Sequence, residues 1–321
     1  MQRALRRVVG LSTGALSFAY LILVLNTVQM LSVVLYPFSH RAFREVNRWC
    51  ARSIWGLWVL MAELQNKLTL RFTGDPLPRR ENALVLPNHQ TMADVMVLIC
   101  FAWRCGRLGD LKWFVKEVIK YVPGPGWGMR FLDCIFVKRD WAQDQHGIAR
   151  LFDKYKRESI PVFLISFLEG TRKTDAKHQS AQAFARDRGL YVPAHTLVPR
   201  TKGFIATMQG LGTHLDAVYD VTIGYHGQPP TLVDCFAAAI ERIDVHVRRY
   251  PIDAIPQGEE AQTAWVFDRF REKDALLAHF HREGSFPGPA HPTRVRALDW
   301  FLPESRRHTA IGDVGDASSA H

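Results

Sequence analysis

The sequence begins with a long stretch, from Val8 to Phe38, that contains no charged residue. As one straight α-helix it would be about 46 Å long, whereas the hydrocarbon core of a bilayer is about 30 Å thick. The stretch can therefore cross a membrane, but only if it tilts or bends. Asn26, Thr27 and Gln29 interrupt the apolar run and offer a place to bend. This leaves two alternatives: one tilted spanning helix, or a bent segment that enters one leaflet and returns as a two-helix membrane motif.

Arginines lie on both sides of this stretch: Arg3, Arg6 and Arg7 precede it, and Arg41, Arg44, Arg48 and Arg52 follow it. The excess of positive charge that marks cytoplasmic loops therefore does not distinguish its two ends, which favours the segment that returns to its own side. A cleaved signal peptide is disfavoured. The stretch is far longer than the apolar part of a signal peptide, and no small-residue cleavage site follows it.

A Trp-rich segment follows the first of these arginines. In residues 47–64, Trp49, Trp55 and Trp58 recur with other apolar residues at helical spacing. Trp-rich faces beside arginines are typical of helices at the membrane interface, but the pattern also fits a helix that faces a protein core. We expect residues 1–65 to form a membrane-embedded or interfacial helical region.

After Leu64 the sequence changes to short runs of branched and aromatic residues, separated by stretches of helical periodicity. This alternation predicts an α/β domain with a largely parallel or mixed sheet flanked by helices. We assign this domain to residues 66–285, and we expect the breaker-rich residues 286–321 to form a disordered tail. The predicted strands are residues 67–72, 83–87, 111–115, 134–137, 161–166, 196–199, 217–223 and 243–247, and the predicted helices are 94–103, 145–157 and 263–283, the last ended by Gly284.

The composition points to an anionic partner. Lys and Arg number 41 against 31 Asp and Glu, giving a formal net charge of +10. A membrane surface, a nucleic acid or a phosphorylated substrate would each suit this charge. The five cysteines form no C-x-x-C pair and are expected to be reduced core residues, and the 13 histidines form no H-E-x-x-H motif. We therefore expect no metal site.

The stretch LVLPNHQTMADVMVL, residues 84–98, stops an apolar run at an Asn-His pair and places Asp94 five positions after His89. If residues 83–87 form a strand, His89 stands at its carboxyl end, where open α/β sheets bind ligands. A helix beginning near Thr91 would bring Asp94 within reach of the imidazole. The alternative is structural, because the segment from Thr91 to Asp94 resembles a capping box that only ties down a helix start. These residues alone do not decide between the two.

Basic and turn-forming residues follow three other predicted strands. They are Lys138 and Arg139 after residues 134–137, the quartet Glu169-Gly170-Thr171-Arg172 after residues 161–166, and Pro199, Arg200 and Lys202 at the end of residues 196–199. Singly, each is more often a solvated loop or a surface ion pair than a binding group. If all four strand ends converge on one rim, however, they place a His/Asp pair beside an anion site. That arrangement is the one needed to acylate a phosphorylated alcohol.

At these residues the chain resembles the glycerolipid acyltransferases with the H-x4-D motif, the 1-acyl-sn-glycerol-3-phosphate (lysophosphatidate) acyltransferase family. The four blocks of that family can be read in order as residues 88–94, CIFVKR, LEGTR and LVPRTKGF. The resemblance continues through AVYDVTI and FREKDALL to FPG, covers most of residues 20–288, and implies a glycerolphosphate acyltransferase-like fold. The chain departs from the family in two ways. Asp133 replaces a Gly often found in the second block, and no hydrophobic segment follows the catalytic region.

The resemblance implies transfer of a fatty acyl group from an acyl thioester to the free hydroxyl of a lysophospholipid, first of all 1-acyl-sn-glycerol-3-phosphate, which would give phosphatidic acid. His89 is then the expected general base and Asp94 the residue that orients it, with direct attack on the thioester. No cofactor is expected. The co-substrate is acyl-CoA or the thioester of acyl carrier protein, which would then be a partner. We expect a membrane location, in a bacterium the inner (cytoplasmic) membrane, with the catalytic domain on the cytoplasmic side.

The resemblance also suggests roles for the other strand-end residues. Arg139 and Arg172 are the first candidates for the substrate phosphate because guanidinium groups match phosphate oxygens, and Lys138, Lys202 and Lys116 are the second. The expected orienting residues are Glu169, Gly170, Thr171 and Pro199. We also expect N–H groups at the start of the helix near Thr91 to meet the thioester oxyanion.

Other functions stay open at this stage. They are an acyltransferase for another lysophospholipid, a thioesterase that uses water in place of the alcohol, and a non-enzymatic basic membrane protein that binds anionic lipid or nucleic acid. The last would explain the charge and the hydrophobic start, but not a His/Asp pair beside an E-G-T-R turn. We therefore expect membrane lipids, and no nucleic acid, among the partners.

Overall fold

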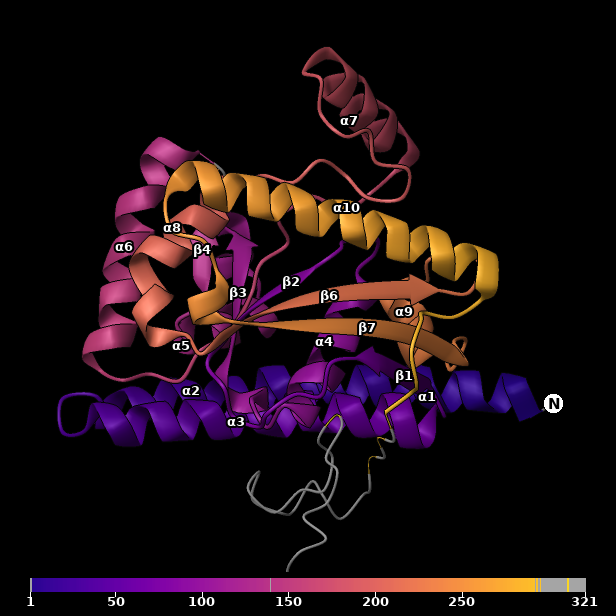
Figure 1. Cartoon of the computed structure of the whole chain (residues 1–321). Coiled ribbons are helices and arrows are strands. Elements are labelled where there is room, and N and C mark those ends of the chain that lie inside the picture. The colour runs from indigo at the N-terminus through magenta and orange to yellow at the C-terminus, as the bar shows by residue number, and fades with distance from the viewer. Residues whose placement is uncertain (1, 139, 292, 294, 296–310, 312–321) are drawn as a thin grey trace, which may run out of the picture.

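The computed structural model describes residues 2–138 and 140–291 together with residues 293, 295 and 311. Two long antiparallel helical arms at the N-terminus lie side by side along one side of a sheet domain (Figure 1). We call them the N-terminal helical pair. The first arm consists of α1 (Gln2–Tyr20), a π-helical turn η1 (Leu21–Leu25), α2 (Asn26–Ser32) and η2 (Val33–Leu35); the second consists of α3 (His40–Leu60) and η3 (Met61–Gln65).

The polar residues in the middle of the first arm do not mark a bend. The helical path continues through them, and the chain turns instead at residues 36–39, where the Ser39 hydroxyl caps α3 by accepting from the Ala42 N–H at 3.1 Å. Asn26 is 1% exposed, and its Oδ1 accepts from the Gly124 N–H at 2.9 Å. Its Nδ2 donates to Gln29 Oε1 at 3.0 Å. This polar cluster therefore fastens the helix to the sheet domain.

The sheet has seven strands in the order β1-β7-β6-β2-β5-β3-β4. Neighbouring strands are parallel except β6 and β7, which are antiparallel. The predicted α/β fold with a mixed sheet is therefore confirmed. The strands are β1 (Thr69–Gly74), β2 (Ala83–Pro87), β3 (Leu111–Lys116), β4 (Ile135–Val137), β5 (Phe163–Ile165), β6 (Ala217–Tyr225) and β7 (Arg242–Pro251).

Helices cover both faces of the sheet because its strands are apolar on both sides. Along β2, Val85 joins the core packed under the N-terminal helical pair, while Leu84 and Leu86 join the core on the other face. The first face is covered by α3 together with α4 (Ala93–Arg104), and the other by α6 (Trp141–Arg157), α8 (Lys202–Leu211) and α10 (Glu259–Glu283). The remaining helical elements are α5 (Pro125–Phe131), α7 (Asp175–Asp187), α9 (Leu232–Phe236), η4 (Leu108–Asp110), η5 (Glu117–Tyr121), η6 (Gly212–His214) and η7 (Ile252–Ala254).

Most predicted elements are present, but the predicted strand at residues 196–199 is wrong. That segment is a loop, and the backbone N–H groups that lead into it are bonded to the Asp274 carboxylate instead of to a neighbouring strand. The late helix was predicted better. α10 ends where Gly284 adopts a left-handed conformation with φ +69°, as the sequence indicated.

Two further features of the sequence have a structural counterpart. Asp133, where the family resemblance led us to expect a glycine, has φ +55° and so keeps the left-handed turn that glycine would favour. Both of its carboxylate oxygens accept from Lys154 Nζ at 2.8 Å. In the region predicted to be a disordered tail, Phe286 is buried and the His291 N–H donates to the Phe72 carbonyl at 2.8 Å. Most of that predicted tail lies outside the described residues.

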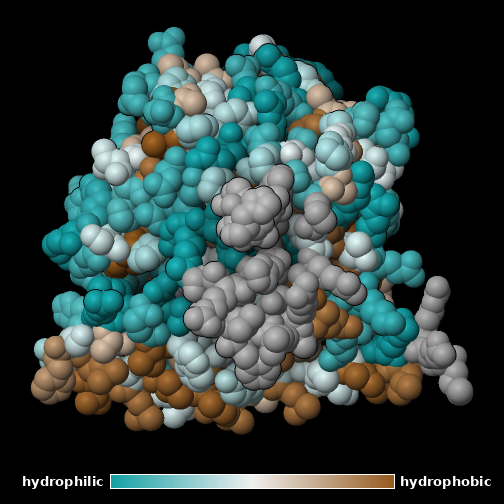
Figure 2. Space-filling view, turned by 60° about the horizontal axis from the view of Figure 1, so that its bottom comes forward, coloured by the Kyte–Doolittle hydropathy of each residue, from teal (hydrophilic) through white to brown (hydrophobic). Residues whose placement is uncertain are grey.

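The first helical arm presents an apolar surface. Within the described residues, Ala4–Leu35 is the one helix long and apolar enough to cross a membrane, with a mean hydropathy of 2.1 in its most apolar window. Figure 2 shows a hydrophobic band along the lower edge of the view, on the side of this arm. The large exposed apolar residues of the arm are Leu5, Val8, Val9, Leu11, Leu16, Ile22, Leu23, Val24, Met30, Leu31, Val33, Val34 and Leu35.

The polar cluster generates a stability prediction. Asn26→Ala leaves the buried Gly124 N–H without its side-chain acceptor and should cost about 1–3 kcal/mol. We expect a lower melting temperature for the detergent-solubilised protein. Thr27→Ala is the matched control, because the exposed Thr27 hydroxyl bonds only to the Leu23 carbonyl of its own helix. Equal melting temperatures for the two variants would show that the cluster does not hold the arm.

Candidate active site

The carboxyl ends of β2, β3, β4, β5 and β6 lie at one edge of the sheet, because these five strands run parallel to one another. At this edge β2 is tied to β6 by Asn88, whose side chain accepts from the Ile223 N–H at 2.8 Å and donates to the Ile223 carbonyl at 3.1 Å. The side chain thus replaces a backbone pairing just past the end of the strand. His89 follows at the rim.

His89 and Asp94 form a direct pair. His89 Nδ1 lies 2.9 Å from Asp94 Oδ2, and the Asp94 side chain is fully buried while that of His89 is 14% exposed. Because a carboxylate only accepts hydrogen bonds, the proton in this contact belongs to Nδ1. Nε2 is then the nitrogen of a neutral imidazole that can accept a proton.

The Asp94 carboxylate also organises the turn before α4. Its Oδ2 accepts from the N–H groups of Gln90 (2.8 Å) and Thr91 (2.9 Å), and its Oδ1 accepts from the Tyr225 hydroxyl at 2.5 Å. The predicted contact with the imidazole is therefore present, but a capping box is not, because α4 begins after Met92 without a side-chain cap and Asp94 orders the turn before it. It also follows that the Gln90 and Thr91 N–H groups, expected to meet an oxyanion, are engaged with Asp94.

The turn after β5 holds the backbone of His89 from two sides. Glu169 Oε1 accepts from the His89 N–H at 3.0 Å, and the Lys173 N–H donates to the His89 carbonyl at 2.8 Å. The Phe167 ring stacks on the imidazole with ring centroids 3.9 Å apart. Gly170, at φ +68°, makes the tight turn that the sequence predicted. The first and third sequence blocks therefore interlock around His89.

A cavity of about 800 Å³ opens beside His89. Its apolar lining includes Phe114, Ile148 and Leu168, so an acyl chain could pack against it. Its charged lining consists of Lys116, Arg188, Arg200, Lys202 and Asp144. Four cations against one carboxylate favour an anionic ligand.

The predicted site residues divide into those that line this cavity and those that do not. The lining includes His89, Gly170, Pro199, Lys116 and Lys202. Asp94 and Glu169 are buried behind His89. Thr171 and Arg172 follow the Gly170 turn and lie outside the lining. Lys138 is exposed, and its Nζ donates to Gln143 Oε1 at 3.2 Å. Arg139 lies outside the described residues.

Three residues of the site had no role assigned from the sequence. Tyr225 ends β6 and reaches Asp94 from far along the chain. Arg200 was visible in the fourth block, and its side chain lies over Gly170, where an added Cβ would be 3.1 Å from Arg200 Cδ. Arg188 follows α7 and carried no recognisable signal. Spacing in the sequence does not reveal such long-range partners.

Comparisons with known proteins identify the family of this chain. An acyltransferase family model matches residues 69–226, and an acyltransferase C-terminus model matches residues 235–302. A probable 1-acyl-sn-glycerol-3-phosphate acyltransferase 5 from Arabidopsis thaliana is 35% identical over 257 residues, which cover 80% of this chain and 68% of the relative. The chain belongs to the 1-acyl-sn-glycerol-3-phosphate acyltransferase family. The human 1-acyl-sn-glycerol-3-phosphate acyltransferase delta is 32% identical to this acyltransferase over 289 residues, covering 87% of this chain and 76% of the relative.

A solved structure shows the same fold as this acyltransferase. The crystal structure of the 1-acyl-sn-glycerophosphate (LPA) acyltransferase PlsC from Thermotoga maritima aligns with a TM-score of 0.52. The alignment covers 86% of this chain and 98% of that one at 16% identity. At this identity the likeness concerns the fold alone.

No cysteine lines the cavity in the part of the chain that the structure describes. All five cysteines are free and buried, as expected of reduced core residues. In the part of the chain that the structure describes, no three or more His, Cys, Asp or Glu side chains are grouped so that they could hold a metal ion.

Glu169 generates a pH prediction. Burial raises the pKa of its carboxyl to about 8, from an ordinary value of 4.5. The folded protein therefore holds a proton that the unfolded chain releases, so the stability that this group contributes is full below pH 4.5 and is lost as the pH rises towards 8. Glu169→Gln keeps an acceptor for the His89 N–H but does not titrate.

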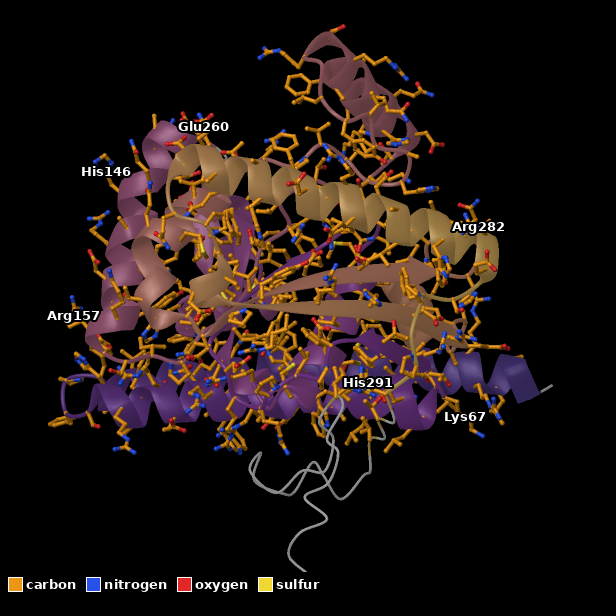
Figure 3. All side chains as sticks on the ribbon, viewed as in Figure 1. Lys67, His146, Arg157, Glu260, Arg282 and His291 are labelled. Carbon is orange, nitrogen blue, oxygen red and sulfur yellow. The ribbon has the colours of Figure 1, made fainter. Side chains whose placement is uncertain are left out.

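We expect the melting temperature of the wild type to fall relative to that of Glu169→Gln between about pH 5 and pH 8. The exposed carboxylate of Glu260, near the start of α10 (Figure 3), gives the control variant Glu260→Gln. Parallel pH profiles for Glu169→Gln and the wild type would show that Glu169 is ionised in the folded state.

Proposed function

We propose that this acyltransferase transfers a fatty acyl group from an acyl-CoA to the free hydroxyl of 1-acyl-sn-glycerol-3-phosphate, giving phosphatidic acid. The observation that carries the proposal is the position of His89. Its Nδ1 is held by a buried carboxylate, and its ring lines a cavity that is largely apolar and whose described charged residues are mostly cations. The names of the relatives support the choice of acceptor.

In the proposed reaction, neutral His89 takes the hydroxyl proton on Nε2 while the hydroxyl oxygen attacks the thioester carbon. The bond from carbon to sulfur then breaks, and the thiolate leaves with the acyl group now on the lysolipid. Asp94 keeps Nε2 available and stabilises the imidazolium, as the aspartate does in a serine hydrolase triad. General-base catalysis contributes about 10²- to 10⁴-fold, so positioning must supply much of the remaining acceleration.

The thiolate needs little help to leave. By analogy with cysteine, the thiol released from the acyl thioester has a pKa of about 8.5, so its anion is a good leaving group near neutral pH. The proton on His89 can return to the departing sulfur. No covalent acyl-enzyme is required, and no cysteine lines the cavity in the described chain.

We assign the substrate phosphate to the cations at the rim of the cavity. Arg200 takes first place because its backbone is anchored beside the site: its N–H donates to the Leu168 carbonyl at 2.8 Å, and its exposed side chain lies over Gly170. Lys116 and Lys202 line the cavity beside it. Arg172 and Arg139 remain candidates from the sequence, as does Lys138, which is exposed.

We place this acyltransferase on a membrane through the N-terminal helical pair. The exposed apolar surface of the first arm is continued by Val118, Tyr121 and Val122, which follow Lys116 of the cavity lining. Near these residues, an added Cβ at Gly124 would lie 3.0 Å from Ile22 Cγ1. A lipid held at this face would therefore be close to the cavity. The catalytic domain would face the cytoplasm, where acyl-CoA is available.

The first test measures free thiol released from oleoyl-CoA by the detergent-solubilised protein, with and without lysophosphatidate. We expect release to require the lysolipid and to fall at least about 100-fold in His89→Ala, since general-base catalysis is lost. His146→Ala is the control, because His146 is exposed on α6 (Figure 3). Release without acceptor would identify a thioesterase. No release by the folded wild type with any lysolipid would refute the proposal.

A second test compares three arginine variants. Arg200→Ala should raise the KM for lysophosphatidate by about tenfold or more, because hydrogen bonds to a charged group are worth about 1.5–3 kcal/mol. The effect should be absent with an uncharged 1-acylglycerol as acceptor. Arg157→Ala, on an exposed guanidinium of α6 (Figure 3), is the control. If Arg172→Ala raises this KM and Arg200→Ala does not, the phosphate site belongs to the Gly170 turn instead.

A further inference from the structure

Among the buried charges that the proposed mechanism does not use, two lie side by side in the chain. Lys273 and Asp274 are neighbours on α10, which runs along the sheet from near Glu260 to near Arg282 (Figure 3). Their relative exposures are 0% and 2%, although charged side chains are rarely fully buried unless they are paired. Neither lines the cavity. They belong to FREKDALL, which lies within the residues 235–302 that the acyltransferase C-terminus model matches and which the proposed chemistry does not use.

Lys273 reaches down to the two central strands. Its Nζ lies 2.6 Å from Asp220 Oδ1, and it donates to the carbonyls of Val221 (2.6 Å) and Leu86 (3.2 Å). Burying an ammonium group is expensive unless its hydrogen-bonding capacity is met. Its hydrogen bonds to these two carbonyls and to the Thr222 hydroxyl at 3.5 Å meet this capacity, and Asp220 balances the charge. The contacts join β6 and β2 to α10 through a single atom.

The contacts of Lys273 fall at the end of the ladder between β2 and β6. Pro87 is the last residue of β2 and pairs in register with Val221. Lys273 supplies donors to carbonyls on both strands at this level. Asn88 then holds the next position through Ile223. His89 is therefore the first residue of the chain beyond a strand end fixed by side chains.

Asp274 holds a different segment. Its Oδ1 accepts from the His195 and Thr196 N–H groups at 2.7 and 2.9 Å, and its Oδ2 accepts from the Ala194 N–H and the Tyr191 hydroxyl, both at 2.9 Å. Burial on its own would raise the pKa of Asp274, but these donors bring the net pKa below its ordinary value. The loop held this way leads directly to Val198, Pro199 and Arg200 of the cavity lining.

We propose that Lys273 and Asp274 are paired positioning residues of the reaction: Lys273 sets the strand end that carries His89, and Asp274 sets the wall that carries Arg200. One rigid helix would thereby hold the base and the anion site at a fixed separation. The inference rests on the proposed acyl transfer for its kinetic consequences. Its structural part, that two neighbouring side chains order two separate segments, can be measured without any activity.

The contacts of Lys273 and those of Asp274 predict different kinetic defects. Loosening the end of β2 should misplace His89 and lower kcat by about tenfold or more, with little change in the KM for lysophosphatidate, since small displacements of a catalytic group are costly. Loosening the loop before Arg200 should raise that KM about tenfold, with a smaller change in kcat. A purely structural role would lower the melting temperature without this division.

The role of Lys273 is tested with the double variant Lys273→Met/Asp220→Asn. Changing Lys273 alone would leave Asp220 buried without its partner and could unfold the protein, whereas the double variant removes both charges. The matched control is Arg104→Met/Glu63→Gln. That pair is also buried, at 2.7 Å, but Arg104 closes the end of α4 opposite to Asp94. Both double variants should lose stability, and the Lys273 variant alone should lose kcat.

The role of Asp274 is tested with Asp274→Asn, which keeps the size of the side chain but weakens its hydrogen bonds to three backbone N–H groups. Its control is Asp110→Asn, a carboxylate that is also 2% exposed but precedes β3, at the edge of the sheet opposite to His89. Asp110 accepts from Arg107 at 3.1 Å and contacts Arg48. We expect the raised KM only in Asp274→Asn.

Hydrogen–deuterium exchange on the full-length variants provides the independent readout. Exchange should rise in residues 84–92 and 217–226 for the Lys273/Asp220 variant, and in residues 191–202 for Asp274→Asn. If folded variants show neither the local exchange nor the divided kinetics, the proposal is overturned. If the wild type transfers no acyl group, the proposed function fails, and the exchange pattern alone decides whether the pair positions these segments.

Discussion

The site depends on one buried carboxylate. Asp94 accepts from His89 Nδ1, from two consecutive backbone N–H groups and from Tyr225, so the orientation of the imidazole, the turn before α4 and the end of β6 share one anchor. A charge buried this deeply is tolerable because all of these donors point at it. In the proposed mechanism this arrangement ties catalysis to folding, since the group that would orient the base is the group that shapes the strand-to-helix turn.

Sequence patterns correctly predicted elements and contacts that depend on residues close together in the chain. The run from Ala83 to Pro87 is a strand over the whole of its predicted length, and His89 and Asp94, five residues apart, meet as the sequence suggested. The stretch at residues 196–199 has the composition of a strand and is a loop, because the Asp274 carboxylate takes the preceding N–H groups before any strand can. Intrinsic β-propensity yields to such a tertiary contact.

The contacts that the sequence did not predict join residues that lie far apart in the chain. Tyr225 reaches Asp94 across 131 residues, and Lys273 reaches the Leu86 carbonyl across 187. No periodicity or spacing encodes such contacts, because they arise only when the sheet order brings β6 beside β2. The role of the polar residues near Asn26, which offered only a place to bend, is hidden from the sequence for the same reason: the partner of Asn26, Gly124, lies 98 residues away.

The exposed apolar arm has a consequence for how the reaction would be measured. An enzyme held at a bilayer by the face of Ala4–Leu35, with Val118 and Tyr121 beside the cavity entrance, would meet its acceptor by lateral diffusion in two dimensions. Its rate would follow the mole fraction of lysolipid in the surface and not the amount per volume of solution. Diluting the acceptor with inert detergent or phospholipid at constant total lysolipid would slow turnover, although nothing in the aqueous phase had changed.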